Sequence, residues 1–191
     1  MSLFDGKGHA ARATVSRLDN DTVELALGDS LPANESPLEL TLAVAVPKGD
    51  TMSLIVQKLT ELGVVTIQPL VSEHSEVPAD VIEKRLDRWR RVALEAAKQC
   101  GRCRLPTIEP SRPFDQVARK GAAILSPGAP PPSSPPPIVL VGPEGGWSSE
   151  ELELAHERDV PVFGLGPRTM RTETATIAVA SVLQWIGGDL G

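Results

Sequence analysis

Two loops in the second half of the chain carry residue types that could form a ligand site. The first is a glycine-rich loop with one carboxylate, Val141-Gly142-Pro143-Glu144-Gly145-Gly146, between a short apolar run and a predicted helix. Ligands of open α/β sheets bind beyond the carboxyl ends of strands, where glycines let the backbone approach them. The loop lacks the Gly-Lys-Ser/Thr of a phosphate-binding loop, and Glu144 would repel a phosphate, so a neutral or cationic ligand fits better. The same glycines would also serve a tight strand-to-helix turn that binds nothing.

The second loop also runs from a predicted strand into a helix and concentrates charge there. Its sequence is Leu165-Gly166-Pro167-Arg168-Thr169-Met170-Arg171-Thr172-Glu173-Thr174-Ala175. Glu173 in the first helical turn complements the helix dipole, which is worth about 0.3–1 kcal/mol and needs no function. Arg171 opposes that dipole, so we expect an anionic group beside it.

A basic stripe lies between residues 83 and 104 of an otherwise acidic chain. Only Glu83, Asp87 and Glu95 oppose its eight basic residues, so the segment carries +5 while the remainder carries −11. Because phosphate neutralisation supplies most non-specific nucleic-acid affinity, the stripe could contact a polyanion; it could equally be a solvated helix face. The basic residues are Lys84, Arg85, Arg88, Arg90, Arg91, Lys98, Arg102 and Arg104.

The elements that must position these loops alternate between strand and helix from residue 38 onward. Alternation of this kind predicts a mostly parallel sheet with helices on both faces. Glycines are expected to end three helices, at Gly63, at Gly101 and at Gly187-Gly188, and the pairs Asp80/Glu83 and Ser148/Glu151 have the spacing of capping boxes. The predicted strands are 38–46, 64–70, 122–125, 138–141 and 160–165, and the predicted helices are 50–62, 80–100, one from 148 onward, and 172–186. Seven prolines make 127–137 an extended loop.

The first fifty residues predict a small β domain, with short strands at 13–15 and 22–27 and a linker at 30–37. Two strands cannot hold a core alone, so further strands or the following domain must support them. The composition is that of a soluble, cytoplasmic globular protein, with no membrane span and no signal peptide expected. Cys100 and Cys103 could form a redox pair, but they follow a helix instead of opening one and cannot alone make a zinc site.

Five segments, in order along nearly the whole chain, resemble the RsmE family of 16S ribosomal RNA methyltransferases in the SPOUT superfamily. They are Leu3-Phe4-Asp5-Gly6-Lys7-Gly8, Val56-Gln57-Lys58-Leu59-Thr60-Glu61-Leu62-Gly63-Val64, Glu95-Ala96-Ala97-Lys98-Gln99-Cys100-Gly101-Arg102, Gly142-Pro143-Glu144-Gly145-Gly146, and Leu165-Gly166-Pro167-Arg168 with Arg171-Thr172-Glu173-Thr174-Ala175. The resemblance makes Cys100 a packing position. His74 departs from it, since an arginine is expected after Ser-Glu.

The resemblance implies a fold with two parts. Residues 1–36 would be a truncated PUA-like β-barrel domain that binds RNA, followed by its linker. Residues 37–191 would be a SPOUT domain with a parallel sheet, helices on both faces and a C-terminal trefoil knot, although knots are rare. The match starts in the middle of the family's barrel, so its opening strands would be absent, and Met1-Ser2 would be vector sequence.

The resemblance also implies an activity. Family members are homodimers that methylate N3 of a uridine in 16S rRNA, or in the assembled small ribosomal subunit, with S-adenosyl-L-methionine, leaving S-adenosyl-L-homocysteine; no metal is needed. Arg171 would stabilise charge developing on the uracil, with Glu173 as proton acceptor or arginine orienter. The cofactor would contact Leu125, Gly142, Pro143, Glu144, Gly145, Gly146, Leu165, Gly166, Met170, Thr172 and Thr174. RNA would contact Lys84, Arg85, Arg88, Arg91, Lys98, Arg102 and Arg104, with Arg102 and Arg104 the strongest candidates. The competing hypotheses are a non-catalytic RNA-binding module and a SPOUT enzyme acting on tRNA.

Overall fold

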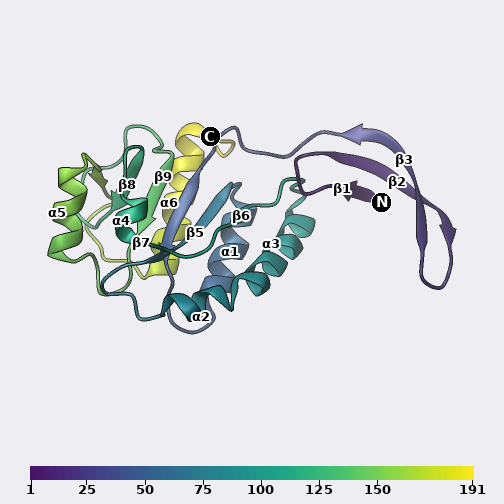
Figure 1. The fold of residues 1–191 in the computed structure, drawn as a ribbon. Helices are drawn as coiled ribbons and strands as arrows, with labels where there is room; N and C mark the ends of the chain where they lie inside the picture. Colours follow the sequence, from purple (N-terminus) through teal and green to yellow (C-terminus); the bar gives the residue numbers. More distant parts are fainter.

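The computed structural model describes residues 1–191 as a narrow β ribbon attached to a compact α/β body (Figure 1). The elements are β1 (Ser2–Phe4), β2 (Ala10–Leu18), β3 (Val23–Leu31), β4 (Thr41–Ala45), α1 (Thr51–Glu61), β5 (Thr66–Val71), α2 (Ala79–Glu83), α3 (Leu86–Cys100), β6 (Thr107–Ile108), β7 (Arg112–Pro113), α4 (Phe114–Val117), β8 (Ala122–Leu125), β9 (Ile138–Val141), α5 (Ser149–Glu157), β10 (Val162–Phe163) and α6 (Thr172–Gly187). No helix is long and apolar enough to cross a membrane.

The α/β body is built on a parallel sheet in the order β10-β8-β9-β4-β5-β6, with β7 also paired to β5. The predicted parallel sheet with helices is therefore confirmed. Alternate strand residues face opposite layers. Leu42 and Val44 join the core shared with α1, α3 and α6, whereas Ala43 joins the smaller core under α4 and α5.

The N-terminal ribbon is an antiparallel sheet in the order β1-β2-β3, longer than the two short strands predicted. It projects from the body beside the end of α3 (Figure 1). Backbone hydrogen bonds attach it to residues 103–105: Gly8 N donates to the Cys103 carbonyl at 3.1 Å and Leu105 N to the Gly6 carbonyl at 3.0 Å. Because β3 continues to Leu31, the predicted linker beginning at residue 30 starts too early.

The predicted helix 80–100 is wrong in its first part. The chain forms α2, then a break at residues 84 and 85, then α3, and no side chain caps either start. Glu83 has another partner, since its carboxylate accepts hydrogen bonds from the backbone N–H and hydroxyl of Ser111 at 2.7 and 2.8 Å. Asp80 instead pairs with Lys84. The end of α3 is as predicted, with Gly101 in the left-handed conformation at φ 80°.

Candidate active site

A pocket lies where β8, β9 and β10 end and the two predicted loops meet. Its cavity measures about 220 Å³. Since these strands are neighbours in a parallel sheet, their carboxyl ends lie at one edge, which is where ligands of such sheets bind. The lining residues are Leu125, Ser126, Pro127, Val141, Gly142, Pro143, Glu144, Gly146, Trp147, Leu152, Leu165, Gly166, Arg168, Thr169, Met170, Thr172 and Ala175.

Trp147 forms an apolar wall of this pocket and is fixed on two sides. Its indole Nε1 donates to the Leu125 carbonyl at 3.2 Å. Its ring lies 5.2 Å from the ring of Phe114, tilted by 54°, a favourable aromatic geometry. The residue was not among the sequence predictions, although an aromatic side chain directly after the glycine-rich loop was a usable signal.

The start of α6 is tied to the glycine-rich loop. The Thr172 hydroxyl donates to the Gly142 carbonyl at 3.2 Å, and the Thr176 hydroxyl donates to the Thr172 carbonyl at 2.6 Å. Thr172 is buried and lines the pocket. The two loops singled out in the sequence therefore form one structural unit.

Two backbone N–H groups of the pocket remain available to a ligand. The N–H groups of Leu165 and Met170 have no acceptor within the chain, whereas the Gly166 carbonyl already accepts from Gly128 N at 3.0 Å. Gly166 has φ 101°, which only glycine adopts readily. The site thus combines apolar walls with unpartnered backbone donors.

The predicted cofactor residues lie together with two exceptions. Gly145 and Thr174 do not line the pocket, while all the others do. The lining residues that sequence reasoning missed include Ser126, Pro127, Arg168 and Thr169.

The two predicted catalytic residues lie beside the pocket but do not line it. Arg171 is the N-cap residue of α6, where its carbonyl accepts from Ala175 N at 2.9 Å and its side chain makes no capping bond. Neither Arg171 nor Glu173 forms an ion pair, so the expected pairing between them is not seen. The charged groups that do line the pocket are the exposed side chains of Glu144 and Arg168.

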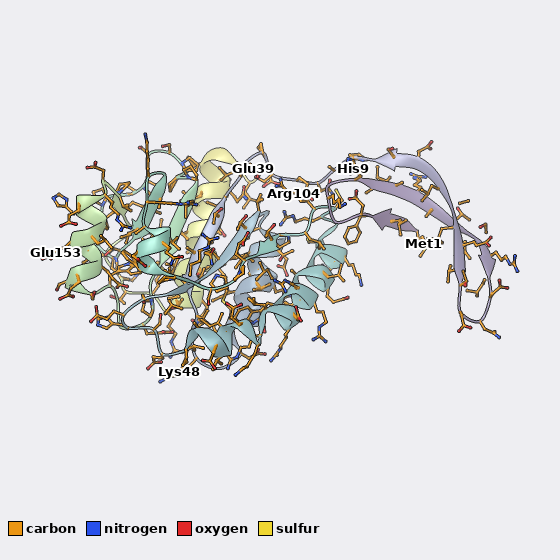
Figure 2. The ribbon with its side chains drawn as sticks, in the orientation of Figure 1. Met1, His9, Glu39, Lys48, Arg104 and Glu153 are labelled. Carbon is orange, nitrogen blue, oxygen red and sulfur yellow. The ribbon has the colours of Figure 1, made fainter.

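The basic stripe is largely neutralised within the chain. Lys84, Arg88, Lys98 and Arg104 pair with Asp80, Asp50, Glu95 and Glu39, respectively. Arg104 and Glu39 face one another where the ribbon meets the body (Figure 2), and this hydrogen-bonded contact raises the pKa of Arg104 above its ordinary value. Arg85 and Arg91 donate instead to the backbone carbonyls of Gly49 and Asp87. Such exposed pairs are weak, so an RNA phosphate could replace them.

The prediction that Arg102 contacts RNA is wrong. Its side chain is 4% exposed, and Nη1 donates to the carbonyls of Thr60 and Val64 at 2.9 and 3.0 Å. Nε donates to Glu35 Oε2 at 3.0 Å; Nη2 lies equally close to that oxygen but is not aligned for a hydrogen bond. The guanidinium joins the linker to the body and cannot reach a phosphate.

Neither cysteine is disulfide-bonded: Cys100 is half-buried and Cys103 is buried. No group of three or more His, Cys, Asp or Glu residues is arranged to hold a metal ion.

Comparisons with known proteins show which family the chain resembles. Residues 34–184 match a family described as an RNA methyltransferase domain. The chain is 34% identical over 197 residues to ribosomal RNA small subunit methyltransferase E of Synechocystis sp., covering 94% of this chain but 64% of that protein, just under two thirds. Its counterpart in Aquifex aeolicus is 30% identical, with 95% and 82% covered. The structure of the Neisseria gonorrhoeae protein of that name, bound to S-adenosyl methionine, matches with a TM-score of 0.90 at 35% identity, covering 100% of this chain and 84% of that one.

Proposed function

Since the chain belongs to the RNA methyltransferase family that includes ribosomal RNA small subunit methyltransferase E, we propose that it methylates N3 of a uridine in 16S rRNA, using S-adenosylmethionine. The observation that carries this proposal is the pocket at the ends of β8, β9 and β10. It unites the glycine-rich loop with the start of α6 and is the site where a methyl donor would bind.

The pocket suits S-adenosylmethionine chemically. The unpartnered N–H groups of Leu165 and Met170 can donate to the ring nitrogens of an adenine, and Trp147 and Leu152 supply apolar surface for the ring. Glu144 at the rim offers a negative charge to a sulfonium or ammonium group. When bound, the cofactor supplies an electrophilic methyl group and leaves as S-adenosylhomocysteine.

Residues of this chain would stabilise the negative charge that develops on the uracil and accept its N3 proton. N3 lies on the Watson–Crick edge and carries a proton, so the base must be unpaired and placed in the site. As the N3 proton leaves, negative charge grows on the uracil oxygens, and a cation beside them stabilises the transition state more than the ground state. Arg171 is the cation we assign, because its side chain is exposed and has no partner in the chain; Glu173 is the candidate proton acceptor.

We propose that RNA is held by the accessible members of the basic stripe, of which Lys84, Arg88, Arg91 and Lys98 are exposed and Arg85 and Arg104 are half-buried. Arg88 and Arg91 line a surface groove between α1 and α3 together with Gln57 and Gln99. Arg85 and Arg91 are the strongest candidates because no carboxylate neutralises them.

We also propose a role in RNA binding for the ribbon, as the family resemblance implies. We propose that residues 1–36 are a partial PUA-like domain and that residues 37–191 are the SPOUT catalytic domain. The start of the family match at residue 34 and the separate antiparallel sheet support this division.

We propose a trefoil knot for this domain, and the close packing of the C-terminal segment against the proline-rich loop supports it. After β10 the chain passes against the proline-rich loop: Gly164 N donates to the Pro130 carbonyl at 2.8 Å, and a Cβ at Gly164 would lie 2.5 Å from the Ser126 carbonyl oxygen. The chain then returns from the sheet edge to α6, which packs against β4 and β9.

We also propose a homodimer. The end of α6 exposes Trp185 at 68% and Ile186 at 41%, more apolar surface than one buried stripe requires. A substrate of 16S rRNA or the assembled small subunit would place the protein in the cytoplasm. Light scattering that returns only the 20.3 kDa chain mass at micromolar concentration would contradict the dimer.

The test of the proposed function joins binding with product identification. The protein should show calorimetric binding and a thermal shift with S-adenosylmethionine in EDTA; a ligand at about 100 times its Kd adds about 2.7 kcal/mol of stability. It should then produce N3-methyluridine in 16S rRNA, identified by nucleoside mass spectrometry, and none in tRNA. Binding of RNA without cofactor binding would indicate a non-catalytic RNA-binding module, and methylation of tRNA alone would indicate a different substrate.

A further inference from the structure

The loop between β5 and α2 contacts the glycine-rich loop on the side away from the pocket. Nδ1 of His74 lies 3.1 Å from the Gly145 carbonyl oxygen and 3.1 Å from the Gly146 carbonyl oxygen. We propose that His74 is a positioning residue that fixes the glycine-rich loop by donating its Nδ1–H to both carbonyls. The inference rests on the proposed function only in taking this loop as a wall of the cofactor pocket.

The two acceptors determine the tautomer of the neutral ring. A carbonyl oxygen can only accept, so a nitrogen that contacts two of them must carry the proton. In the neutral side chain this selects the Nδ1–H tautomer and leaves Nε2 as an acceptor. The contact therefore holds the ring in one orientation with one tautomer.

The backbone on both sides of His74 is anchored independently. Ser72 N donates to the Ser75 hydroxyl at 2.8 Å, and Ser75 N donates to the Ser72 carbonyl at 3.0 Å, which forms a tight turn that presents His74. Glu73 N donates to Glu151 Oε1 at 3.0 Å. The other oxygen of Glu151 accepts from Ser148 N, so the same carboxylate caps α5 and anchors the turn.

The glycine at the contact permits the close approach. A Cβ added to Gly145 would lie 3.0 Å from the Cβ of His74, so a side chain there would push the histidine away. Gly145 does not line the pocket, whereas Glu144 and Gly146 on either side of it do. His74 can therefore hold the loop from behind without occupying ligand space.

A loop that is ordered before binding loses less conformational entropy when the ligand arrives. The predicted effect of His74 is thus on cofactor affinity and loop order, with little effect on the chemistry itself. If the net free energy of one such hydrogen bond is lost from loop ordering, cofactor affinity should fall about 3- to 10-fold.

The test compares His74→Ala with His74→Asn and uses His156→Ala as the control, because His156 is exposed at the end of α5 and makes no side-chain hydrogen bond. Asparagine carries an N–H donor on Cγ, at the same number of bonds from the backbone as Nδ1 of histidine. We expect His74→Ala to weaken S-adenosylmethionine binding about 3- to 10-fold. Amide exchange at residues 144–147 should also become faster in the free protein, and His74→Asn should restore most of both properties.

Nitrogen NMR of the free protein gives a readout that needs no cofactor. His74 should be locked in the Nδ1–H tautomer, whereas His156 should show the ordinary mixture. An Nε2–H tautomer at His74, or loop exchange and affinity unchanged in His74→Ala, would overturn the proposal. If the wild-type protein bound no S-adenosylmethionine, the proposed function would fail. The tautomer and the amide exchange of the loop would still decide whether His74 fixes the glycine-rich loop.

Discussion

The indole of Trp147 lies directly against Gly142: a Cβ added to Gly142 would come within 3.0 Å of Trp147 Cε2 and 3.2 Å of Cζ2. The glycine in this loop therefore leaves room for a protein side chain as well as for a ligand. Because Trp147 Nε1 also donates to the Leu125 carbonyl, the wall of the pocket depends on this contact.

Gly142→Ala should displace the indole and weaken cofactor binding. Overpacking of this kind costs about 1–3 kcal/mol of folding free energy. The indole N–H resonance of Trp147 should shift as its hydrogen bond to Leu125 breaks. Gly28→Ala is the control, since its Cβ would meet nothing closer than 3.7 Å, and it should change stability by less than about 0.5 kcal/mol. Equal effects of the two substitutions would contradict the role given to Trp147.

Glu35→Ala should be among the most destabilising single changes outside the core. Glu35 Oε1 accepts from the backbone N–H groups of Cys103 and Arg104 at 2.9 and 2.7 Å, while Oε2 accepts from the buried Arg102. Removing one partner of a buried ion pair leaves an uncompensated charge, which costs about 3–5 kcal/mol. Glu39→Ala breaks only the exposed pair with Arg104 and should cost less than about 1 kcal/mol. Urea unfolding of both variants measures the contrast.

RNA binding should depend on the accessible basic residues of the stripe and not on the buried Arg102. Charge reversal at Arg85 and Arg91 together should lower RNA affinity and reduce the logarithmic salt slope by somewhat under one for each phosphate that is no longer neutralised. Lys120→Glu is the control, since Lys120 is an exposed basic residue that lies outside the stripe. If the double reversal left affinity and slope at wild-type values, the stripe would be only a solvated face.

Cys103 should resist alkylation in the folded protein, whereas Cys100 should react. Burial raises the pKa of the Cys103 thiol, and the nearby charge of Glu35 raises it further. The native state therefore holds this proton more tightly than the unfolded chain, so stability should fall as the pH rises above the unfolded thiol pKa near 9. Peptide mass spectrometry after iodoacetamide treatment with and without denaturant measures the protection, and equal labelling of both cysteines in the native protein would contradict it.

Two pairs of identical spacing show what local sequence could predict and what it could not. Ser148 and Glu151 form the predicted capping box, because Ser148 Oγ accepts from Glu151 N and Glu151 Oε2 accepts from Ser148 N. Asp80 and Glu83 do not, because Ser111, 28 residues further along the chain, binds the Glu83 carboxylate. Spacing defines which caps are possible, and a distant partner decides which of them form.

The same limit applies to the site. The ends of apolar strands and the glycines next to them were sufficient to predict where a pocket would form, because parallel strands bring their carboxyl ends to one edge. The burial of Arg102 could not be predicted in this way, since its partners Glu35, Thr60 and Val64 lie 67, 42 and 38 residues away. A positive residue after a helix is usually exposed, and the linker together with the carbonyls at the end of α1 makes this one part of the interior.

Arg171→Ala should reduce methylation far more than it weakens cofactor binding. The side chain is exposed, forms no ion pair and makes no capping bond, so its removal breaks no ion pair or hydrogen bond within the chain and should not lower stability. Its charge at the helix N-terminus is unfavourable until a uracil loses its N3 proton, so the interaction strengthens only as methyl transfer proceeds. Removing a group of this kind typically costs about 100- to 1000-fold in turnover.

Arg168→Ala is the matched control for Arg171→Ala, because Arg168 lines the pocket from the same loop and should act mainly on cofactor affinity. Single-turnover methylation at saturating cofactor, with calorimetric affinity and thermal stability measured on the same variants, separates binding from chemistry. If Arg171 merely ordered the loop, affinity and stability would fall together and turnover would recover at saturating cofactor. Full turnover in Arg171→Ala under those conditions would remove the catalytic role that we assign to it, and the developing charge on the uracil would then need another cation, for which the pocket offers Arg168.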